Sequence, residues 1–246
     1  MTAPHRSHSC THSTRPATRS IVRSFMRERV AQFRVPYTDF MAKGRRVFLL
    51  SPARYDGERA QLLLSERAQF PLACRVREPA GASLGEVMTF LSGLYFRGKL
   101  AYAAAFARPP VDGEGVLVIT SDGGLQPPST IVTVASLRRG ARVDIDAANA
   151  RYRKPLEASA RDLACRLSPR DDVVLLGSIA SPKYVDVLTA VFGERLLFPL
   201  EFVGRGDMSR GGLLLRCVAA GLELTYAPVL GARRHGPRPP RLPALR

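Results

Sequence analysis

Two short polar stretches of the sequence combine glycines, hydroxyl groups and cations. One lies between an apolar run and a helix-like pattern, and the other lies directly before a helix-like pattern. Residues 177–184 (GSIASPKY) follow the apolar run VVLL, and residues 204–212 (GRGDMSRGG) precede the run LLLR. Backbone N–H groups without intrahelical partners and the helix dipole converge at helix entries, where they attract anions. The stretches therefore predict these ligand-binding residues: Gly177, Ser178, Ser181, Lys183, Arg205, Gly206, Ser209 and Arg210.

Each stretch also has a simpler structural interpretation. Ser181 before Pro182 is typical of a helix N-cap followed by proline at the first helical position. Asp207 or Ser209 could cap the next helix in the same way. The first stretch lacks the glycine-lysine-hydroxyl order of a Walker sequence, and the second lacks the glycine spacing of a dinucleotide fingerprint. Capping alone and capping combined with an anion site both remain open.

A third candidate lies within residues 92–102 (SGLYFRGKLAY). Arg97 and Lys99 supply positive charge there, and the aromatic residues could stack on a base. The alternative is that Tyr95 and Tyr102 belong to the core, while the two cations belong to a solvated helix face.

The sequence is poor in groups that usually carry catalysis. His235 is the only histidine after residue 40, which disfavours a Ser-His-Asp triad. A general base would then be a carboxylate, and the candidates are Asp122, Glu201 and Asp207. The four cysteines show neither a CxxC arrangement nor zinc-ligand spacing, so we expect no metal and no cofactor. An N-terminal group could bind a metal on paper, although its segment is expected to be disordered: His5, His8, Cys10 and His12.

The positive charge is concentrated at the two ends of the chain. The formal net charge is +16, and residues 1–40 and 231–246 carry +5 each, which leaves +6 for the body. Arginine-rich ends favour contacts with nucleic-acid phosphates, so nucleic acid is a second expected partner. The same bias towards arginine is also what a GC-rich genome produces, without any functional meaning.

Composition divides the chain into three parts. Residues 1–40 form a basic extension, expected to be disordered, and Met41 is an alternative start; an organelle transit peptide would have a similar composition. Residues 41–230 are expected to form a single domain, and residues 231–246 a basic, proline-rich tail. No apolar run approaches the roughly 20 residues of a membrane span, so no membrane contact is expected. The cysteine pattern fits a reducing compartment, and we expect a cytoplasmic location.

Apolar runs and helix-like stripes alternate along the body. This order predicts an α/β three-layer sandwich with a mostly parallel sheet of about five strands. The expected strands span residues 47–50, 116–119, 173–176, 196–198 and 222–226. The expected helices span residues 58–64, 83–107 with an interruption at Gly93, 155–167, 182–192 and 209–220. Loops after Leu50, Ile119, Leu176 and Phe198 would then meet at one edge of the sheet and form a pocket.

Residues 90–135 resemble a group of uncharacterised bacterial and phage domains. The resemblance is carried by residues 92–102, by the run at 116–119, and by the turn at 124–128 (GLQPP) with Ile131. It implies an α/β fold akin to nucleobase-handling glycosylase or transglycosylase domains. Residues 120–123 (TSDG) depart from the serine-alanine-lysine turn of that group, so no lysine role transfers there, and no catalytic residue is carried over.

These observations lead to a protein that binds a phosphorylated or nucleobase-containing ligand. If it is an enzyme, N-glycosidic or nucleotide chemistry with a carboxylate base is the expected reaction. The alternatives are a non-catalytic nucleic-acid-binding module that uses the basic ends, and a structural or toxin-system accessory protein without a small-molecule site.

Overall fold

The computed structural model describes residues 44–242. The expected basic extension, the alternative start at Met41 and the histidine-cysteine group near the N-terminus lie outside the described residues. The last four residues of the proline-rich tail also lie outside them.

A six-stranded sheet forms the centre of the described part, in the order β4-β3-β1-β6-β7-β8. Its strands are β1 (Arg46–Leu50), β3 (Val116–Ile119), β4 (Leu125–Gln126), β6 (Asp172–Leu176), β7 (Leu196–Pro199) and β8 (Tyr226–Pro228). The four inner strands are parallel, whereas β4 and β8 run antiparallel at the two edges. This confirms the α/β class and the mostly parallel sheet; β4, which forms a tight hairpin with β3, was not expected.

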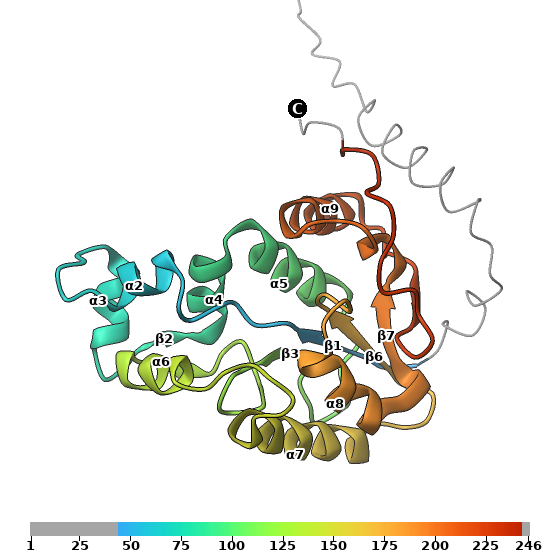
Figure 1. Cartoon of the computed structure of the whole chain (residues 1–246), viewed down its shortest axis with the longest axis horizontal. Helices are drawn as coiled ribbons and strands as arrows, with labels where there is room; N and C mark the ends of the chain where they lie inside the picture. The colour runs from blue at the N-terminus through green and yellow to red at the C-terminus, as the bar shows by residue number, and fades with distance from the viewer. Residues whose placement is uncertain (1–43, 243–246) are drawn as a thin grey trace, which may run out of the picture. The chain divides into compact units, whose positions relative to one another are not determined.

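The helices of the described part are α2 (Glu58–Leu64), α3 (Pro71–Arg77), α4 (Leu84–Ser92), α5 (Leu94–Phe106), α6 (Val134–Ala141), α7 (Ala150–Arg166), α8 (Pro182–Phe192) and α9 (Asp207–Ala220). In Figure 1, α5 and α9 lie on one side of this sheet and α7 and α8 on the other, whereas α2, α3 and α6 lie away from it. Two 3-10 turns, η2 (Gly193–Arg195) and η3 (Leu200–Phe202), flank β7. A small two-stranded sheet of β2 (Ala82–Ser83) and β5 (Ile131–Val132) lies apart from the main sheet.

Alternate residues of β1 face opposite sides of the sheet, as the period of an extended strand requires. Val47 and Leu49 belong to the core cluster that includes residues of α7 and α8. Phe48 instead meets Tyr102 of α5, with ring centroids 5.8 Å apart. Helices α5 and α8 therefore cover opposite faces of the same central strand, and this explains why β1 is apolar without interruption.

One expected helix break is confirmed, whereas the bounds of α7 and β8 differ from the sequence expectation. The helix expected over residues 83–107 breaks at Gly93 (φ 61°) into α4 and α5, as the interruption there predicted. Helix α7 begins at Ala150 rather than at Pro155, because the Asn149 side chain caps it and Tyr152 is buried in the core. The strand expected over residues 222–226 is β8 instead, shifted towards the C-terminus by its pairing with β7.

Helices α5 and α9 cross with their backbones in contact. A methyl group on Gly98 would lie 2.7 Å from the carbonyl oxygen of Gly211, and one on Gly211 would lie 2.7 Å from the carbonyl oxygen of Leu94. Contacts this short are possible only between residues without side chains. The pair of glycines therefore fixes the distance between the two helices, and with it the position of every side chain next to the crossing.

The C-terminal tail returns along the body after β8. It turns at Gly231 (φ 73°), and the Arg234 guanidinium then lies 3.9 Å from the Asp186 carboxylate of α8. Further along, the carbonyl oxygen of Pro237 lies against Gly204, which adopts a positive φ of 73°. The described part of the tail thus packs on the segment between η3 and α9.

None of the helices in the described part of the chain combines the length and the apolar character that crossing a bilayer requires.

Candidate functional site at the carboxyl ends of β1 and β6

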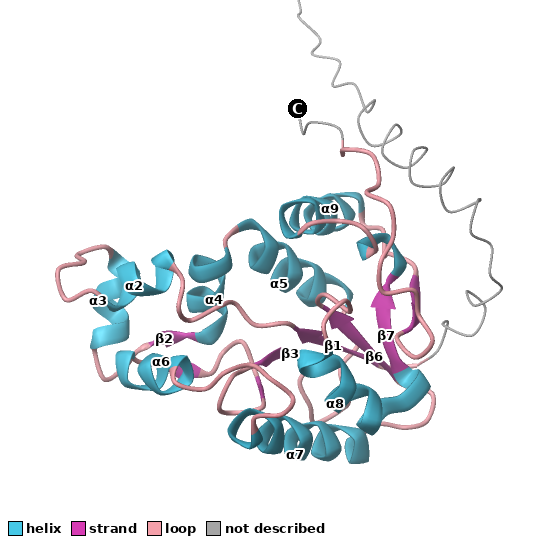
Figure 2. Ribbon diagram, viewed as in Figure 1, coloured by secondary structure: helices cyan, strands magenta, loops and turns pink. Residues whose placement is uncertain are grey.

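Strands β1 and β6 are neighbours, but the chain leaves them towards opposite faces of the sheet. After β1 it passes through α4 and α5 to reach β3, and after β6 it passes through α8 to reach β7. In open α/β sheets, ligands bind outside the carboxyl ends of two neighbouring strands whose connections diverge in this way. The loops that follow β1 and β6 are drawn in pink, like the other loops, in Figure 2.

Ser51, the first residue after β1, is bonded to a lysine from α5. The Lys99 ammonium group donates to the Ser51 carbonyl oxygen at 2.5 Å and to its Oγ at 2.9 Å. Lys99 is only 1% exposed and Ser51 only 6%. The ammonium group also lies 4.5 Å from the centre of the Tyr95 ring and 4.8 Å from that of Phe96. A buried cation is therefore held by one serine and two aromatic faces.

Gly177, the first residue after β6, lies directly beside this pair. A methyl group at Gly177 would come within 2.9 Å of the Ser51 Cβ and 3.0 Å of the Tyr184 hydroxyl. That hydroxyl donates to the Ser178 carbonyl oxygen at 3.0 Å and accepts from the Ser178 N–H at 3.1 Å. It also interacts with Ser51. Glycine is needed here because two side chains converge on the backbone.

The first turn of α9 completes the group from the other side. Arg210 pairs with Asp207 at 3.4 Å, donates to the carbonyl oxygen of Phe202, and lies 5.3 Å from the centre of the Phe202 ring. The charges of Asp207 and Arg210 both act on Lys99 and on Tyr184. The crossing of α5 and α9 brings these groups together. We refer to Ser51, Lys99, Tyr184, Asp207 and Arg210 as the Ser51 cluster.

Burial dominates the acid-base properties of the cluster. It lowers the pKa of Lys99 from 10.5 to about 7, because the charged form loses its hydration. Asp207 opposes this shift in pKa and Arg210 adds to it. Burial also raises the pKa of the Tyr184 hydroxyl. Lys99 is therefore a cation that can lose its proton near neutral pH, whereas Tyr184 keeps its proton.

The three sequence candidates thus meet at one place through Lys99, Tyr184, Asp207 and Arg210. The polar groups of the 177–184 stretch are otherwise used locally. The Ser178 hydroxyl accepts from the Ala180 N–H at 3.4 Å, and the Ser181 hydroxyl accepts from the Lys183 N–H at 3.5 Å as the N-cap of α8. The Lys183 side chain is exposed. The pKa of Asp56, in the loop after β1, is lowered mainly by Arg54 and to a smaller extent by the charge of Lys183.

In the 204–212 stretch, the expectation that Asp207 or Ser209 caps α9 was wrong. Gly206 occupies the N-cap position, and no side chain caps the helix. The Ser209 hydroxyl instead accepts from Arg205 at 3.2 Å, and Arg205 also donates to the carbonyl oxygen of Glu201. Gly206 is exposed, with open space around its Cα. Much of this stretch therefore serves to shape the loop.

The remaining candidates lie apart from the cluster or are occupied by internal bonds. Arg97 is exposed, unlike Lys99 two residues later. Asp122 is exposed in the hairpin between β3 and β4, where the Thr120 hydroxyl bonds to the carbonyl oxygen of Gly124. Burial raises the pKa of Glu201, whose Oε1 accepts from the Thr225 N–H at 3.0 Å. Of the three candidate carboxylates, Asp207 is the one whose charge reaches Lys99.

Sequence reasoning did not single out Ser51 as a site residue. It predicted a pocket-forming loop after Leu50 without naming Ser51 as a ligand-binding residue, and left open whether Lys99 was solvated. Residues 95, 99 and 102 are spaced three or four apart, so they lie on one face of α5. The interpretation that put Tyr95 and Tyr102 in the core should therefore have put Lys99 there too, rather than on a solvated face.

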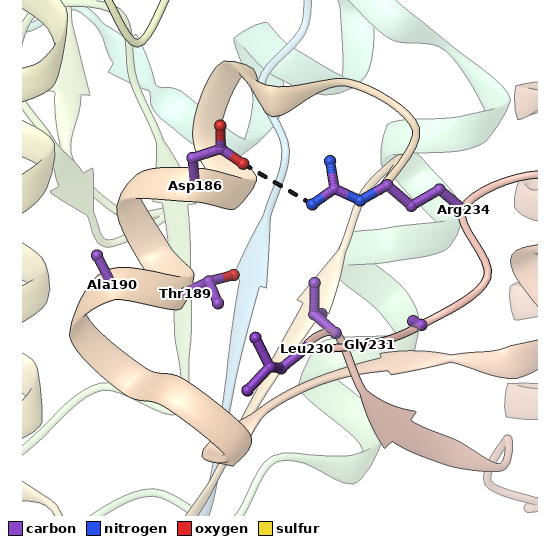
Figure 3. Close-up of a pocket in the computed structure, with 8 residues that line it drawn as sticks. Asp186, Thr189, Ala190, Leu230, Gly231 and Arg234 are labelled. Carbon is purple, nitrogen blue, oxygen red and sulfur yellow. Dashed lines mark ion pairs between the residues drawn. The ribbon is translucent and has the colours of Figure 1, made fainter.

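A separate cavity of about 500 Å³ lies between α8 and the segment after β8 (Figure 3). The carboxylate of Asp186 and the guanidinium of Arg234 face each other across it. Its lining includes Thr189 and Leu230 but none of the predicted ligand-binding residues and none of the Ser51 cluster. Within the described residues, no group of three or more histidine, cysteine or acidic side chains is arranged to hold a metal ion.

Comparison of the chain with protein-family models, with curated proteins and with solved structures found no match.

Proposed function

We propose that this protein binds a small anionic ligand, phosphorylated or containing a nucleobase, at the carboxyl ends of β1 and β6. The observation that carries the proposal is that Lys99 and Tyr184 both interact with Ser51, and that the charge of Arg210 acts on both of them, at the point where the chain leaves the two strands towards opposite faces. The location supports a ligand site, because open α/β sheets bind their ligands where neighbouring strands diverge in this way.

The charges at the rim support the anionic character of the ligand. Arg210 offers a planar guanidinium from the first turn of α9, and Lys183 is exposed at the first turn of α8. A guanidinium can hold a phosphate or carboxylate through two parallel hydrogen bonds. The partly buried Arg210 side chain, which is 12% exposed, loses less hydration on binding than a fully solvated arginine does.

Of the three carboxylates expected as a general base, we keep only Asp207 as a candidate. Asp207 has an exposed side chain at the rim, and its charge acts on Lys99 and Tyr184. In the N-glycosidic reaction it would serve as the general base that activates water. We expect release of free base from a bound nucleoside, and loss of that release in Asp207→Asn.

Thermal unfolding in the presence of candidate ligands tests the binding proposal. The probes are inorganic phosphate, ribose 5-phosphate, free nucleobases and nucleoside monophosphates. A ligand present at 100 times its Kd stabilises the folded state by about 2.7 kcal/mol. For a domain of this size that raises the Tm by roughly 5–10 °C.

Arg210→Gln is the test variant, and Arg97→Gln is its control because Arg97 is an exposed arginine outside the cluster. Ligand stabilisation should disappear in Arg210→Gln and persist in Arg97→Gln. The proposal is refuted if no probe raises the Tm of the unmodified protein, or if both variants lose the same amount of ligand stabilisation.

The described tail supports nucleic-acid binding as a second candidate function. Arg238 and Arg241 are exposed on the segment that packs beside Gly204, close to where α9 begins. Phosphate contacts of this kind make binding weaken steeply with salt. Arg238→Gln with Arg241→Gln should weaken salt-sensitive binding of a single-stranded oligonucleotide. The exposed pair Arg138 and Arg139 of α6 provides a charge-matched control, and equal losses in both double variants would argue against a role of the tail.

We also propose a cytoplasmic location. The support is that the cysteines in the described part of the chain, Cys74, Cys165 and Cys217, are all free thiols, which fits a reducing compartment.

A further inference from the structure

We propose that Ser51 is a nucleophile and Lys99 its general base, and that together they hydrolyse a carboxylic ester through an acyl-Ser51 intermediate. This inference concerns the reactivity of Ser51 and does not depend on which anion the neighbouring residues bind.

The geometry is that of an activated nucleophile. A serine hydroxyl is a weak nucleophile until a base within about 2.6–3.2 Å removes its proton. The Ser51 Oγ lies 2.9 Å from the Lys99 Nζ. A second bond from Nζ to the Ser51 carbonyl oxygen, at 2.5 Å, holds the amine against the serine rather than leaving it free to rotate. Lysine serves as the base for serine in one of the known variants of the catalytic triad.

The surroundings of Lys99 favour its neutral form, which a base requires. The charged groups that act on it are Asp207 and Arg210 from α9. The titratable groups nearby are Tyr95 on its own helix and Tyr184 of α8, which belongs to the same cluster. Burial outweighs the attraction of Asp207 and brings the pKa of Lys99 to about 7. A neutral amine is therefore accessible near neutral pH, and in that form the Ser51 hydroxyl can donate to Nζ.

The reaction balances with water as the second substrate. The Ser51 proton moves to the Lys99 Nζ as Oγ bonds to the acyl carbon, and the ester C–O bond then breaks as the departing alcohol takes that proton from Nζ. Water next loses a proton to Nζ and attacks the acyl carbon. The Ser51–acyl bond breaks, and the serine oxygen recovers the proton from Nζ. The products are a carboxylic acid and an alcohol, and the pair returns to its starting state.

The loop that follows the serine holds a weakly engaged donor. Pro52 has no N–H, but the Ala53 N–H donates to the Met88 sulfur at 3.4 Å. A thioether is a weak acceptor, so a developing negative charge on the substrate could compete for this N–H.

The alternative is that Lys99 only anchors the loop after β1. Both roles predict loss of stability when Lys99 is replaced, but only the nucleophile-base role predicts a covalent adduct. The protein is therefore treated with p-nitrophenyl acetate and, separately, with a small alkyl fluorophosphonate. Intact mass and peptide mapping locate any adduct, and release of p-nitrophenolate gives the rate.

We expect one adduct per chain on Ser51, which is absent in Ser51→Ala and reduced at least tenfold in Lys99→Met. Ser129→Ala is the matched control, because Ser129 is an exposed serine in the turn between β4 and β5, outside the Ser51 cluster, and the Ser51 adduct should form unchanged in this variant. The acylation rate of the unmodified protein should rise through pH 7 and level off about one pH unit higher. This pH profile keeps the test valid even if Lys99→Met fails to fold.

The inference is overturned if Ser51 remains unmodified by both reagents, if the adduct forms elsewhere, or if the rate does not change through pH 7. These results differ from failure of the proposed function, because neither reagent is an anion. Ligand stabilisation that depends on Arg210 would still be seen if Ser51 were inert, and acylation of Ser51 would still be seen if no anion bound.

Discussion

Adding one methyl group at the crossing of α5 and α9 tests how the Ser51 cluster is assembled. Gly211→Ala places that methyl 2.7 Å from the Leu94 carbonyl oxygen and 2.8 Å from the Cα of Tyr95, both of which are backbone atoms. Since backbone cannot rotate away as a side chain can, the two helices must separate. The neighbouring Gly212→Ala makes the same chemical change, but its methyl meets side chains alone: the end of the flexible Arg216 at 3.0 Å and the Leu242 Cδ1 at 3.8 Å.

The two variants are expected to change stability in opposite directions. Alanine is favoured over glycine in the interior of a helix by about 0.5–1 kcal/mol, and both positions gain this amount. Gly211→Ala must also absorb an overpacking cost of about 1–3 kcal/mol. We therefore expect Gly211→Ala to lose about 1–2 kcal/mol and Gly212→Ala to gain up to about 1 kcal/mol. The Tm values of the two variants should differ by roughly 5–10 °C.

Calorimetry and urea unfolding of both variants measure this difference. The separation of α5 from α9 should also change the environment of Lys99, which NMR titration of its Nζ resonance would report as an altered pKa in Gly211→Ala alone. Equal Tm values for the two variants would refute the reasoning, because the helices would then have room for a side chain at their crossing.

Three further predictions follow from the buried polar groups and a helix cap. Lys99→Met should remove a pH dependence of the stability. The pKa of Lys99 is about 7 in the folded protein and 10.5 ordinarily, so the unfolded chain binds more protons between these two pH values. The free energy of unfolding of the unmodified protein should therefore rise with pH in this range, by up to about 1.4 kcal/mol per pH unit. Urea unfolding at pH 7, 8 and 9 measures it, and parallel curves for the two proteins would contradict it. Arg46→Met should cost about 3 kcal/mol, because the buried guanidinium pairs with Asp172 at 3.2 Å and with Glu223; denaturant midpoints measure this, and a loss below about 1 kcal/mol would show that the partly exposed acids are adequately solvated alone. Ser83→Ala should cost about 1 kcal/mol, because it removes the capping box of α4; Ser83→Asp keeps an N-cap acceptor, and thermal unfolding should show that it retains most of the stability.

Local pattern predicted those elements of the fold that local interactions determine. The apolar runs of β1, β3 and β6 are buried along nearly their whole length, so each run showed where its strand lies. The Ser181-Pro182 pair gave the start of α8, because N-cap and first-turn preferences act within three residues. Helix α7 was predicted too short because a proline usually opens a helix, whereas here Pro155 is tolerated within the helix while Tyr152, one turn earlier, is fully buried.

Contacts between distant residues could not be predicted in the same way. The shift of β8 towards the C-terminus depends on its pairing with β7 and on the Leu224 N–H, which donates to the Tyr102 hydroxyl from 122 positions away. The glycines of the 204–212 stretch indicated a ligand loop, but Gly211 is needed for contact with another helix. Ser51 and Lys99 are 48 positions apart, and only the arrangement of β1 and α5 brings them together.

Because Pro237 contacts Gly204, a protein that binds the proline-rich tail would compete with the loop before α9 for the same segment. The Pro237 carbonyl oxygen occupies the side of Gly204 where any other residue would carry a side chain. A protein that grips the tail in an extended, polyproline form must first detach it from this loop. Capture of the tail and packing of the segment before α9 are then mutually exclusive. By linkage, a ligand that binds only while the tail packs on this segment weakens capture of the tail, and capture of the tail weakens binding of that ligand by the same factor. The affinity of the tail for such a protein would then depend on whether the site near the start of α9 is occupied.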